Sequence, residues 1–244
     1  MVIEERQRRI LELLREEPEA TVKALAGALY VSEPTLRRDL TELEKKGLLR
    51  KVYGGARLTA GPADREIPYI LREKEKGEVK ARLGRQAASH VRDGMVLMLD
   101  GSTSAYHLIP YLTAFRDLIV VTSGAKAALA LAEANIRVYS TGGEMIVHSF
   151  SYVGRQAEDF VRSYNADVCF FSCRGMDGDG LLTDLAVQEV NLRRAMMEQS
   201  QKRVLLLSSE KLGKRYFYTQ GRSTEVDAIV CDAPLPHGVC LRET

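Results

Sequence analysis

Residues 31–58 read VSEPTLRRDLTELEKKGLLRKVYGGARL, and this stretch decides the fold of the first part of the chain. Ser32 is a good N-cap, because its hydroxyl can accept a backbone N–H of the first helical turn. Pro34 falls inside that turn, where a missing donor costs little. The stretch therefore predicts a helix that begins after Ser32 and ends near Lys46, with Gly47 as a left-handed stop.

The predicted helix has an apolar face and a polar face. Leu36, Leu40 and Leu43 are spaced at i, i+4 and i+7, so they form one apolar seam against a core. The side chains expected outside that seam are Thr35, Arg37, Arg38 and Thr41. A helix of this kind can present its polar face to a ligand while its seam holds it to the domain.

The flanking segments predict a winged helix-turn-helix. Upstream we expect one amphipathic helix from about Glu5 to Glu16 and a second one capped by Thr21, separated from the third helix only by residues 30–32. Downstream, residues 48–53 and 56–58 predict two short strands around Gly54-Gly55. Such a short connection places the third helix in the major groove of DNA.

Charge supports DNA binding only locally. Residues 31–60 hold seven Lys or Arg against four Asp or Glu, whereas residues 1–30 hold five against six. A net charge of +2 for the whole chain would not by itself indicate a nucleic-acid partner, but phosphate binding needs only a basic face. The alternative is an ordinary solvated helix face. The residues expected to bind DNA are Ser32, Thr35, Arg37, Arg38, Thr41, Arg50, Lys51, Tyr53, Gly54, Gly55 and Arg57.

The N-terminal segment resembles the winged-helix signature of the DeoR family of bacterial transcription regulators. The resemblance rests on Leu25-Ala26, Val31-Ser32, Thr35 to Leu40, Leu43, Gly47 and Gly54 to Ala56. The family usually has His before Gly-Gly-Ala, where this chain has Tyr53, a side chain that can still donate to a phosphate.

Composition predicts a cytoplasmic protein of two domains. Its 244 residues exceed one small domain, and 45% apolar content can fill a core. The N-terminus lacks a signal-peptide pattern, and no apolar run approaches membrane-span length. The four cysteines form no C-x-x-C pair, so we expect reduced thiols and neither a metal site nor a cofactor.

A boundary is expected after the wing. We predict a DNA-binding domain at residues 1–58, a linker at 59–75 and an α/β domain at 76–244. Gly61, Pro62 and Pro68 break the periodicity of the linker. A helix from about Tyr69 to Arg92 is expected to follow and to pack on the second domain.

The second domain alternates apolar strands with helical segments, which indicates a parallel α/β sheet. The six expected strands are Met95–Leu99, Leu118–Val121, Ile136–Ser140, Asp167–Phe171, Arg203–Leu207 and Val226–Cys231. In open sheets of this kind, ligands bind beyond the carboxyl ends of the strands. The loops that follow the strands are therefore the candidate site.

These loops are rich in glycine and hydroxyl groups, which suit a phosphate at a helix N-terminus. Alone, each is more often an N-cap or a turn, but five successive strand ends of this kind favour a binding crevice. The residues expected to bind an effector are Asp100, Gly101, Ser102, Thr103, Ser104, Thr122, Ser123, Gly142, Gly143, Gly175, Asp177, Arg193 and Lys211.

Residues 76–232 also resemble the DeoR-type sensor domain, a ribose-5-phosphate-isomerase-like α/β fold that binds phosphorylated sugars. The matching positions are Asp100, Thr103, Thr122, Gly142, Gly143, Gly154, Asp167, Gly175, Asp177, Gly180, Glu189, Lys211 and Gly213. The chain departs from the family at Ser123, Ser208 and Arg193, where Asn, Asp and Lys are common. Arginine keeps the charge and can hold a phosphate with two N–H groups.

Two functions remain open at this point. The favoured one is a sequence-specific transcription regulator of sugar metabolism genes, a repressor that binds operator DNA as a homo-oligomer and responds to a phosphorylated sugar. The alternative is a phosphosugar isomerase with an accessory winged helix, in which Asp177, Asp179 or Asp184 would move a proton. Loop capping is the other role open to these carboxylates. We expect no catalytic residue and no membrane partner.

Overall fold

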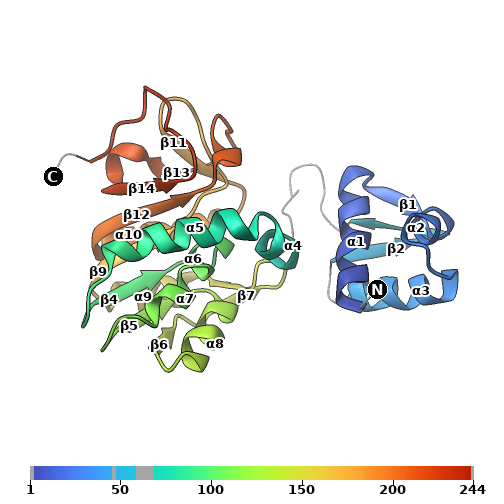
Figure 1. Cartoon of the computed structure of the whole chain (residues 1–244), viewed down its shortest axis with the longest axis horizontal. Helices are drawn as coiled ribbons and strands as arrows, with labels where there is room; N and C mark the ends of the chain where they lie inside the picture. The colour runs from blue at the N-terminus through green and yellow to red at the C-terminus, as the bar shows by residue number, and fades with distance from the viewer. Residues whose placement is uncertain (1–2, 46–47, 59–68, 243–244) are drawn as a thin grey trace. The chain divides into compact units, whose positions relative to one another are not determined.

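The computed structural model describes residues 3–45, 48–58 and 69–242 (Figure 1). The chain divides into two compact units, Met1–Glu75 and Lys76–Thr244. Gly47, the expected helix stop, lies outside the described residues, as do residues 59–68 of the expected linker.

The first unit is built from three helices, α1 (Ile3–Glu16), α2 (Val22–Leu29) and α3 (Glu33–Lys45). Thr21 caps α2, because its hydroxyl accepts the N–H of Ala24 at 3.1 Å. The Ser32 hydroxyl takes the same role for α3 by accepting the N–H of Thr35 at 3.4 Å. The predicted helices and caps are therefore confirmed.

The expected wing belongs to a sheet of three strands in the order β1-β3-β2. The hairpin consists of β2 (Leu49–Val52) and β3 (Gly55–Leu58), and β1 (Glu19–Thr21) pairs with β3 on its other side. Sequence analysis missed β1 because three residues between two helices carry no alternating pattern. The apolar seam of α3 packs with residues of α1, α2 and the hairpin in one core.

The continuous helix expected from Tyr69 to Arg92 is wrong. The structure has α4 (Tyr69–Lys74), α5 (Gly77–Ala87) and a 3-10 turn, η1 (Ala88–His90). The break falls at Lys76, whose φ of 53° is left-handed and ends the α-helical hydrogen-bond pattern. Leu71 of α4 is buried in the core of the first unit, whereas α5 packs on the sheet of the second.

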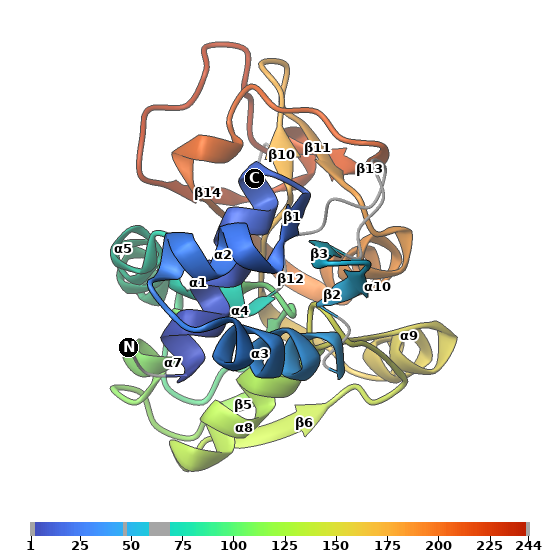
Figure 2. The ribbon, with the colours of Figure 1, turned by 90° about the vertical axis from the view of Figure 1, so that its right-hand side faces the viewer.

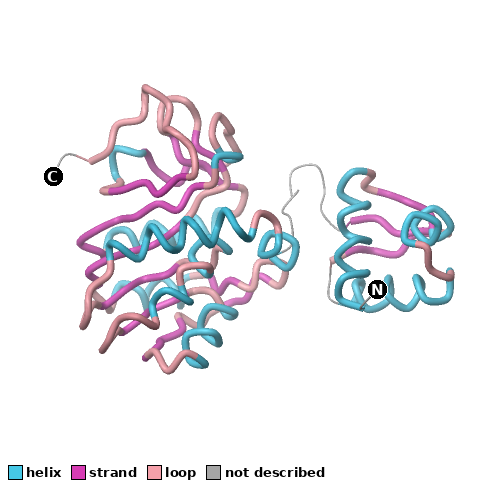
Figure 3. Tube along the Cα trace, viewed as in Figure 1, coloured by secondary structure: helices cyan, strands magenta, loops and turns pink. Residues whose placement is uncertain are grey.

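All six expected strands form one parallel sheet in the order β14-β12-β9-β4-β5-β6 (Figure 3). Their bounds are Val96–Leu99 for β4, Ile119–Thr122 for β5, Arg137–Ser140 for β6, Ala166–Phe171 for β9, Ser200–Leu207 for β12 and Ala228–Cys231 for β14. Because every pair is parallel, the carboxyl ends of the strands meet at one edge of the sheet.

Helices cover both faces of this sheet (Figure 2). One core holds side chains of α5, α6 (Thr103–Tyr106), α7 (Ile109–Leu112) and α8 (Ala125–Glu133). The opposite core holds side chains of α9 (Arg155–Arg162) and α10 (Val187–Glu198). The second unit is therefore a three-layer domain, and the predicted parallel α/β sheet is confirmed.

Two small antiparallel sheets were not predicted. One is the hairpin of β7 (Glu144–Ile146) and β8 (Ser151–Val153). The other joins β10 (Gly175–Met176), β11 (Leu181–Asp184) and β13 (Tyr218–Arg222). Two further 3-10 turns are η2 (Ser209–Lys211) and η3 (Ser223–Glu225). In the part of the chain that the structure describes, no helix has the length and apolar character needed to cross a membrane.

Candidate functional site

The expected DNA-binding residues lie on α3 and the wing. Eight of the eleven are exposed, Thr35 and Thr41 are half-buried, and Gly55 is buried. Within the described ranges, Arg38 and Arg50 have no ion-pair partner, so their charges are available to an external anion. Arg37 pairs weakly with Glu33 at 3.4 Å.

The wing and the exposed face of α3 are joined by Lys51. Its ammonium donates to the Thr41 hydroxyl at 3.2 Å and pairs with Glu44 at 3.3 Å, and its backbone N–H donates to the same carboxylate. Farther along the wing, Tyr53 is fully exposed at the turn, and the Gly54 carbonyl accepts the N–H of Val22 at the start of α2. Lys51 therefore links the wing to the α3 residues Thr41 and Glu44.

Two of the wing residues serve the sheet itself. The guanidinium of Arg57 pairs with Glu19 of β1, with its Nε 2.8 Å from the carboxylate. A Cβ on Gly55 would overlap the Ala20 carbonyl, so glycine is required where β3 passes β1. Beneath α3, Arg6 pairs with the buried carboxylate of Asp39, a contact that the sequence did not reveal.

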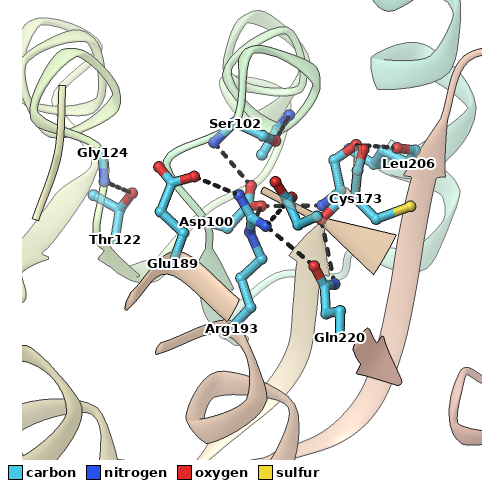
Figure 4. Close-up of polar contacts among 12 residues, drawn as sticks. Asp100, Ser102, Thr122, Gly124, Cys173, Glu189, Arg193, Leu206 and Gln220 are labelled. Atoms are coloured by element: carbon cyan, nitrogen blue, oxygen red, sulfur yellow. Dashed lines mark hydrogen bonds and ion pairs between the residues drawn. The ribbon is translucent and has the colours of Figure 1, made fainter. Parts of the chain in front are cut away.

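In the second unit, the loop after β4 is fixed from inside by Asp100. Its side chain is 1% exposed, and its two oxygens accept the N–H groups of Ser102 at 3.1 Å and Ser172 at 3.0 Å (Figure 4). The Ser102 hydroxyl then accepts the N–H of Ala105 and so caps α6. Asp100 therefore shapes the loop from inside the domain.

The loops after β4 and β5 are interlocked. The Thr122 hydroxyl accepts the N–H of Gly124 at 3.1 Å, and a Cβ on Gly124 would lie only 3.1 Å from the Cα of Gly101. The β7–β8 hairpin meets both loops, because the Tyr152 N–H donates to the Ser123 carbonyl at 2.7 Å and a Cβ on Gly101 would overlap the Ser151 hydroxyl. Glycine is thus required where these three segments meet, because it has no side chain.

Two buried hydroxyl groups at this edge are unsatisfied. Ser104 and Ser149 are 1% and 0% exposed, and among the described residues neither hydroxyl oxygen has a hydrogen-bond partner. Buried polar groups are nearly always paired, so these two hydroxyls are candidate contacts for a bound molecule. Ser149, in the β7–β8 turn, was not expected from the sequence.

Arg193 was expected to meet a phosphate, and the structure turns it toward the protein instead. Its guanidinium donates to Asp100 at 3.0 Å, to Asp184 at 2.5 Å, to Gln220 at 3.1 Å and to Glu189 at 3.2 Å, and all these side chains are buried (Figure 4). Three carboxylates therefore surround one guanidinium, and Arg193 connects the β4 loop with α10, β11 and β13.

Electrostatics keep Asp184 and Arg193 of this cluster ionised. Burial opposes ionisation of Asp184, but the charges of Arg193 and Arg174 and the Leu185 N–H outweigh it and hold the pKa of this carboxyl below its usual value. The same carboxylates raise the pKa of the Arg193 guanidinium against the effect of burial. Burial raises the pKa of the neighbouring Cys173 thiol to about 12, so this cysteine is an inert core residue.

The strand ends on the other side of β4 carry Ser172 and Lys211. The Lys211 ammonium donates to the Ser172 hydroxyl at 2.8 Å, and that hydroxyl donates to the Leu206 carbonyl at 2.7 Å. Sequence analysis missed Ser172, although it directly follows the apolar run of β9 and the strand-end rule could have found it. Gln220 was missed because β13 was not predicted.

The other expected effector residues have mixed surroundings. Gly142 and Gly143 follow β6 with φ values of 61° and 102°, which favour glycine. Gly175 is buried in β10, where a Cβ would meet the Lys214 carbonyl. Asp177 caps the β10–β11 turn, since one oxygen accepts the N–H groups of Asp179 at 3.1 Å and Leu181 at 2.9 Å. Among the described residues, no group of His, Cys, Asp and Glu could hold a metal ion.

A winged helix-turn-helix followed by an open parallel sheet with a polar carboxyl edge defines a class of DNA-binding regulators with a separate ligand-binding domain. The comparisons with known proteins name the family. Residues 6–60 match the DeoR-like helix-turn-helix domain, and residues 75–233 match the DeoR C-terminal sensor domain. The chain belongs to the DeoR family of transcription regulators.

Its relatives match along nearly their whole length. The HTH-type transcriptional regulator YulB of Bacillus subtilis is 32% identical over 236 residues, which cover 96% of this chain and 91% of that protein. The glycerol-3-phosphate regulon repressor of Escherichia coli is 28% identical over 236 residues, or 96% and 93% of the two chains. A solved ribose 5-phosphate isomerase is 16% identical, with a TM-score of 0.43, over 56% of this chain and 54% of its own.

Proposed function

We propose that this protein binds operator DNA through α3 and the wing, and that a phosphorylated sugar at the carboxyl edge of the second unit controls this binding. The observation that carries the effector part is the pair of buried, unsatisfied hydroxyls of Ser104 and Ser149 beside the interlocked loops. A phosphoryl group accepts hydrogen bonds from hydroxyl and backbone N–H groups at such loops.

The electrostatics of the loop support an anionic ligand. Asp100 is the acidic residue of the β4 loop, and its charge is compensated by the 3.0 Å ion pair with Arg193. Lys211 supplies an ammonium at the neighbouring strand end. A phosphoryl group at the Gly101–Ser104 segment would therefore meet neutral donors and a cation. Arg193 would act on it through Asp100.

We infer that the second unit binds a sugar phosphate without converting it to a product. An isomerase needs a carboxylate that can take a proton from the sugar carbon. Asp177 instead accepts two backbone N–H groups of its own turn, and Asp184 pairs with Arg193. Both carboxylates are thus occupied by the protein, which supports loop capping over catalysis.

On DNA, we propose that Thr35 and Arg38 read bases from α3, while Arg50, Lys51 and Tyr53 contact phosphates. Each winged helix reads one half-site, so binding to a symmetric operator requires a homo-oligomer. We propose that this homo-oligomer is a dimer or a tetramer. We further propose that it acts in the cytoplasm as a repressor. Sedimentation of the full chain with and without duplex DNA measures the number of copies bound.

Thermal denaturation tests the effector part. Glycerol 3-phosphate is the first probe because a relative is named for it, followed by ribose 5-phosphate, fructose 6-phosphate and glucose 6-phosphate. At 100 times its Kd, a ligand stabilises the folded state by about 2.7 kcal/mol. We expect one probe to raise the Tm of the wild type but not of Ser104→Val. If any probe is instead converted with sustained turnover that Asp177→Asn abolishes, the protein is an isomerase.

A further inference from the structure

An ion pair ties the start of the second unit to the carboxyl edge of its sheet. Lys76 is the first residue of the second unit, and its ammonium lies 2.9 Å from the carboxylate of Glu210. The other carboxylate oxygen of Glu210 accepts the Ser208 hydroxyl at 3.1 Å. Burial raises the pKa of Glu210, but Lys76 and Ser208 outweigh it, so this carboxyl is ionised at neutral pH.

Glu210 shares a single 3-10 turn with Lys211. This turn, η2, spans Ser209–Lys211. Glu210, which pairs with Lys76, and Lys211, which reaches the strand ends, are therefore adjacent in the sequence. Lys211 donates to Ser172, and the Ser172 N–H donates to Asp100 at 3.0 Å. A continuous series of contacts therefore runs from the loop after β4 to Lys76.

The two ends of η2 are tied to the rest of the domain. The Ser209 N–H and hydroxyl donate to the carboxylate of Asp232, at 2.6 Å and 3.0 Å. Leu212 forms a bridge with Met176 of the small antiparallel sheet. Glu210 and Lys211 lie between these two tethered positions, so a change at either residue is passed to the other within one turn.

A movement of Glu210 would act on the backbone conformation of Lys76. Lys76 has φ 53° and ψ 40°, a left-handed conformation that a residue with a Cβ adopts only when its surroundings hold it there. It separates α4 from α5, and its carbonyl accepts the Lys80 N–H at 3.0 Å, which starts α5. The ion pair with Glu210 therefore holds the side chain of the residue that starts α5.

We propose that the η2 turn, with Lys211 at its last position and the Glu210–Lys76 pair directly before it, relays effector occupancy to the junction that carries the DNA-binding unit. An anion at the β4 loop competes with Ser172 for the Lys211 ammonium and shifts η2. The Glu210 carboxylate then moves relative to Lys76 and changes the backbone preference of the junction. This relay rests on the proposed function, because it needs an anionic effector.

The pair suits a switch because it is only partly buried, with the Lys76 side chain 44% and the Glu210 side chain 30% exposed. Pairs of this kind contribute little to stability, so breaking one leaves the fold intact. What the pair changes is the difference in DNA affinity between the empty and the occupied states, which is a coupling between two sites.

The test uses Lys76→Met in the full chain, with Arg116→Met as the matched control. Arg116 forms an exposed ion pair with Asp93 at 3.1 Å in the same unit, away from η2. DNA affinity is measured by fluorescence anisotropy on a duplex that the wild type selects from a random pool, with and without the sugar phosphate that raises the wild-type Tm. Calorimetry measures the binding of that sugar phosphate to each variant.

We expect Lys76→Met to bind the sugar phosphate like the wild type and to reduce the effector-induced change in DNA affinity about two- to fivefold. Arg116→Met keeps the full change. The double variant Lys76→Glu with Glu210→Lys restores the pair with its charges exchanged, and we expect it to regain most of the response.

The relay is overturned if Lys76→Met keeps the wild-type response, if Arg116→Met loses it equally, or if Lys76→Met no longer binds the sugar phosphate. The last result would make Lys76 part of the binding site. If DNA binding by the wild type ignores all four sugar phosphates, the proposed function fails and the relay with it. If the sugar phosphate changes the DNA affinity of the wild type and of Lys76→Met equally, the relay is wrong but the proposed function stands.

Discussion

Replacing Arg193 with methionine is expected to destabilise the second unit strongly. Methionine fills a similar volume but leaves the carboxylates of Asp100, Asp184 and Glu189 buried without their guanidinium. Removing one partner of a buried ion pair costs about 3–5 kcal/mol, since the remaining charge keeps its desolvation penalty. For a domain of this size, each kcal/mol lowers the Tm by about 2–4 °C, so the expected loss is about 6–20 °C.

The pH dependence identifies the cause of that loss. In the wild type the pKa of Asp184 lies below its unfolded value, so its contribution is present above that value and disappears as the pH falls through the folded pKa. Without Arg193, burial dominates and raises the pKa values of the buried carboxyls. As the pH falls, these carboxyls become protonated, and the variant loses the buried negative charge that destabilises it. The Tm difference between wild type and variant should therefore shrink from pH 7.5 to pH 5.

Scanning calorimetry at both pH values measures this difference. Arg193→Lys is the companion variant, because it keeps the charge but one ammonium cannot replace the four contacts of the guanidinium, and we expect an intermediate Tm. If Arg193→Met melts within about 2 °C of the wild type, or if the gap widens at pH 5, the cluster does not hold the domain together as described.

Four further substitutions test the first unit. Arg50→Ala should weaken binding to every duplex and lower the slope of log K against log salt by about 0.9, the loss of one phosphate contact, as measured by anisotropy at several salt concentrations. Arg38→Ala should instead relax base preference in a selection from random DNA, and unchanged preference would contradict the orientation of α3. Gly55→Ala should destabilise the wing by about 1–3 kcal/mol in urea, because its Cβ meets the Ala20 carbonyl, whereas Gly27→Ala, with open space at its Cβ, should stabilise α2.

The central strands β4, β5, β9 and β12 could be predicted because they are largely buried, whereas the edge strand β6 is mostly exposed. Buried strands appear as apolar runs, as in Phe170-Phe171 of β9 or Leu205 to Leu207 of β12. The strands that were missed are short or carry polar side chains, such as Gln220 of β13. Their pairing is decided by contacts distant in the chain, which no local pattern records.

The candidate site was predictable at the level of loops but not of contacts. The strand-end rule located Asp100 and Lys211 correctly at the carboxyl edge. It could not show that Arg193 faces Asp100, 93 residues away in the chain, because a helix position alone does not reveal a side chain's partner. The left-handed backbone of Lys76 was hidden for the same reason, since lysine gives no signal for a helix break.

Control of DNA binding by a phosphorylated sugar is tested most directly by the wild-type Kd for its selected duplex, measured by anisotropy with and without saturating sugar phosphate. Couplings between sites in proteins are typically 5- to 150-fold, and we expect a change of at least about fivefold with one of the four sugar phosphates. A Kd that stays the same with all four, on a duplex bound specifically, would contradict the assignment of the carboxyl edge as a phosphosugar sensor.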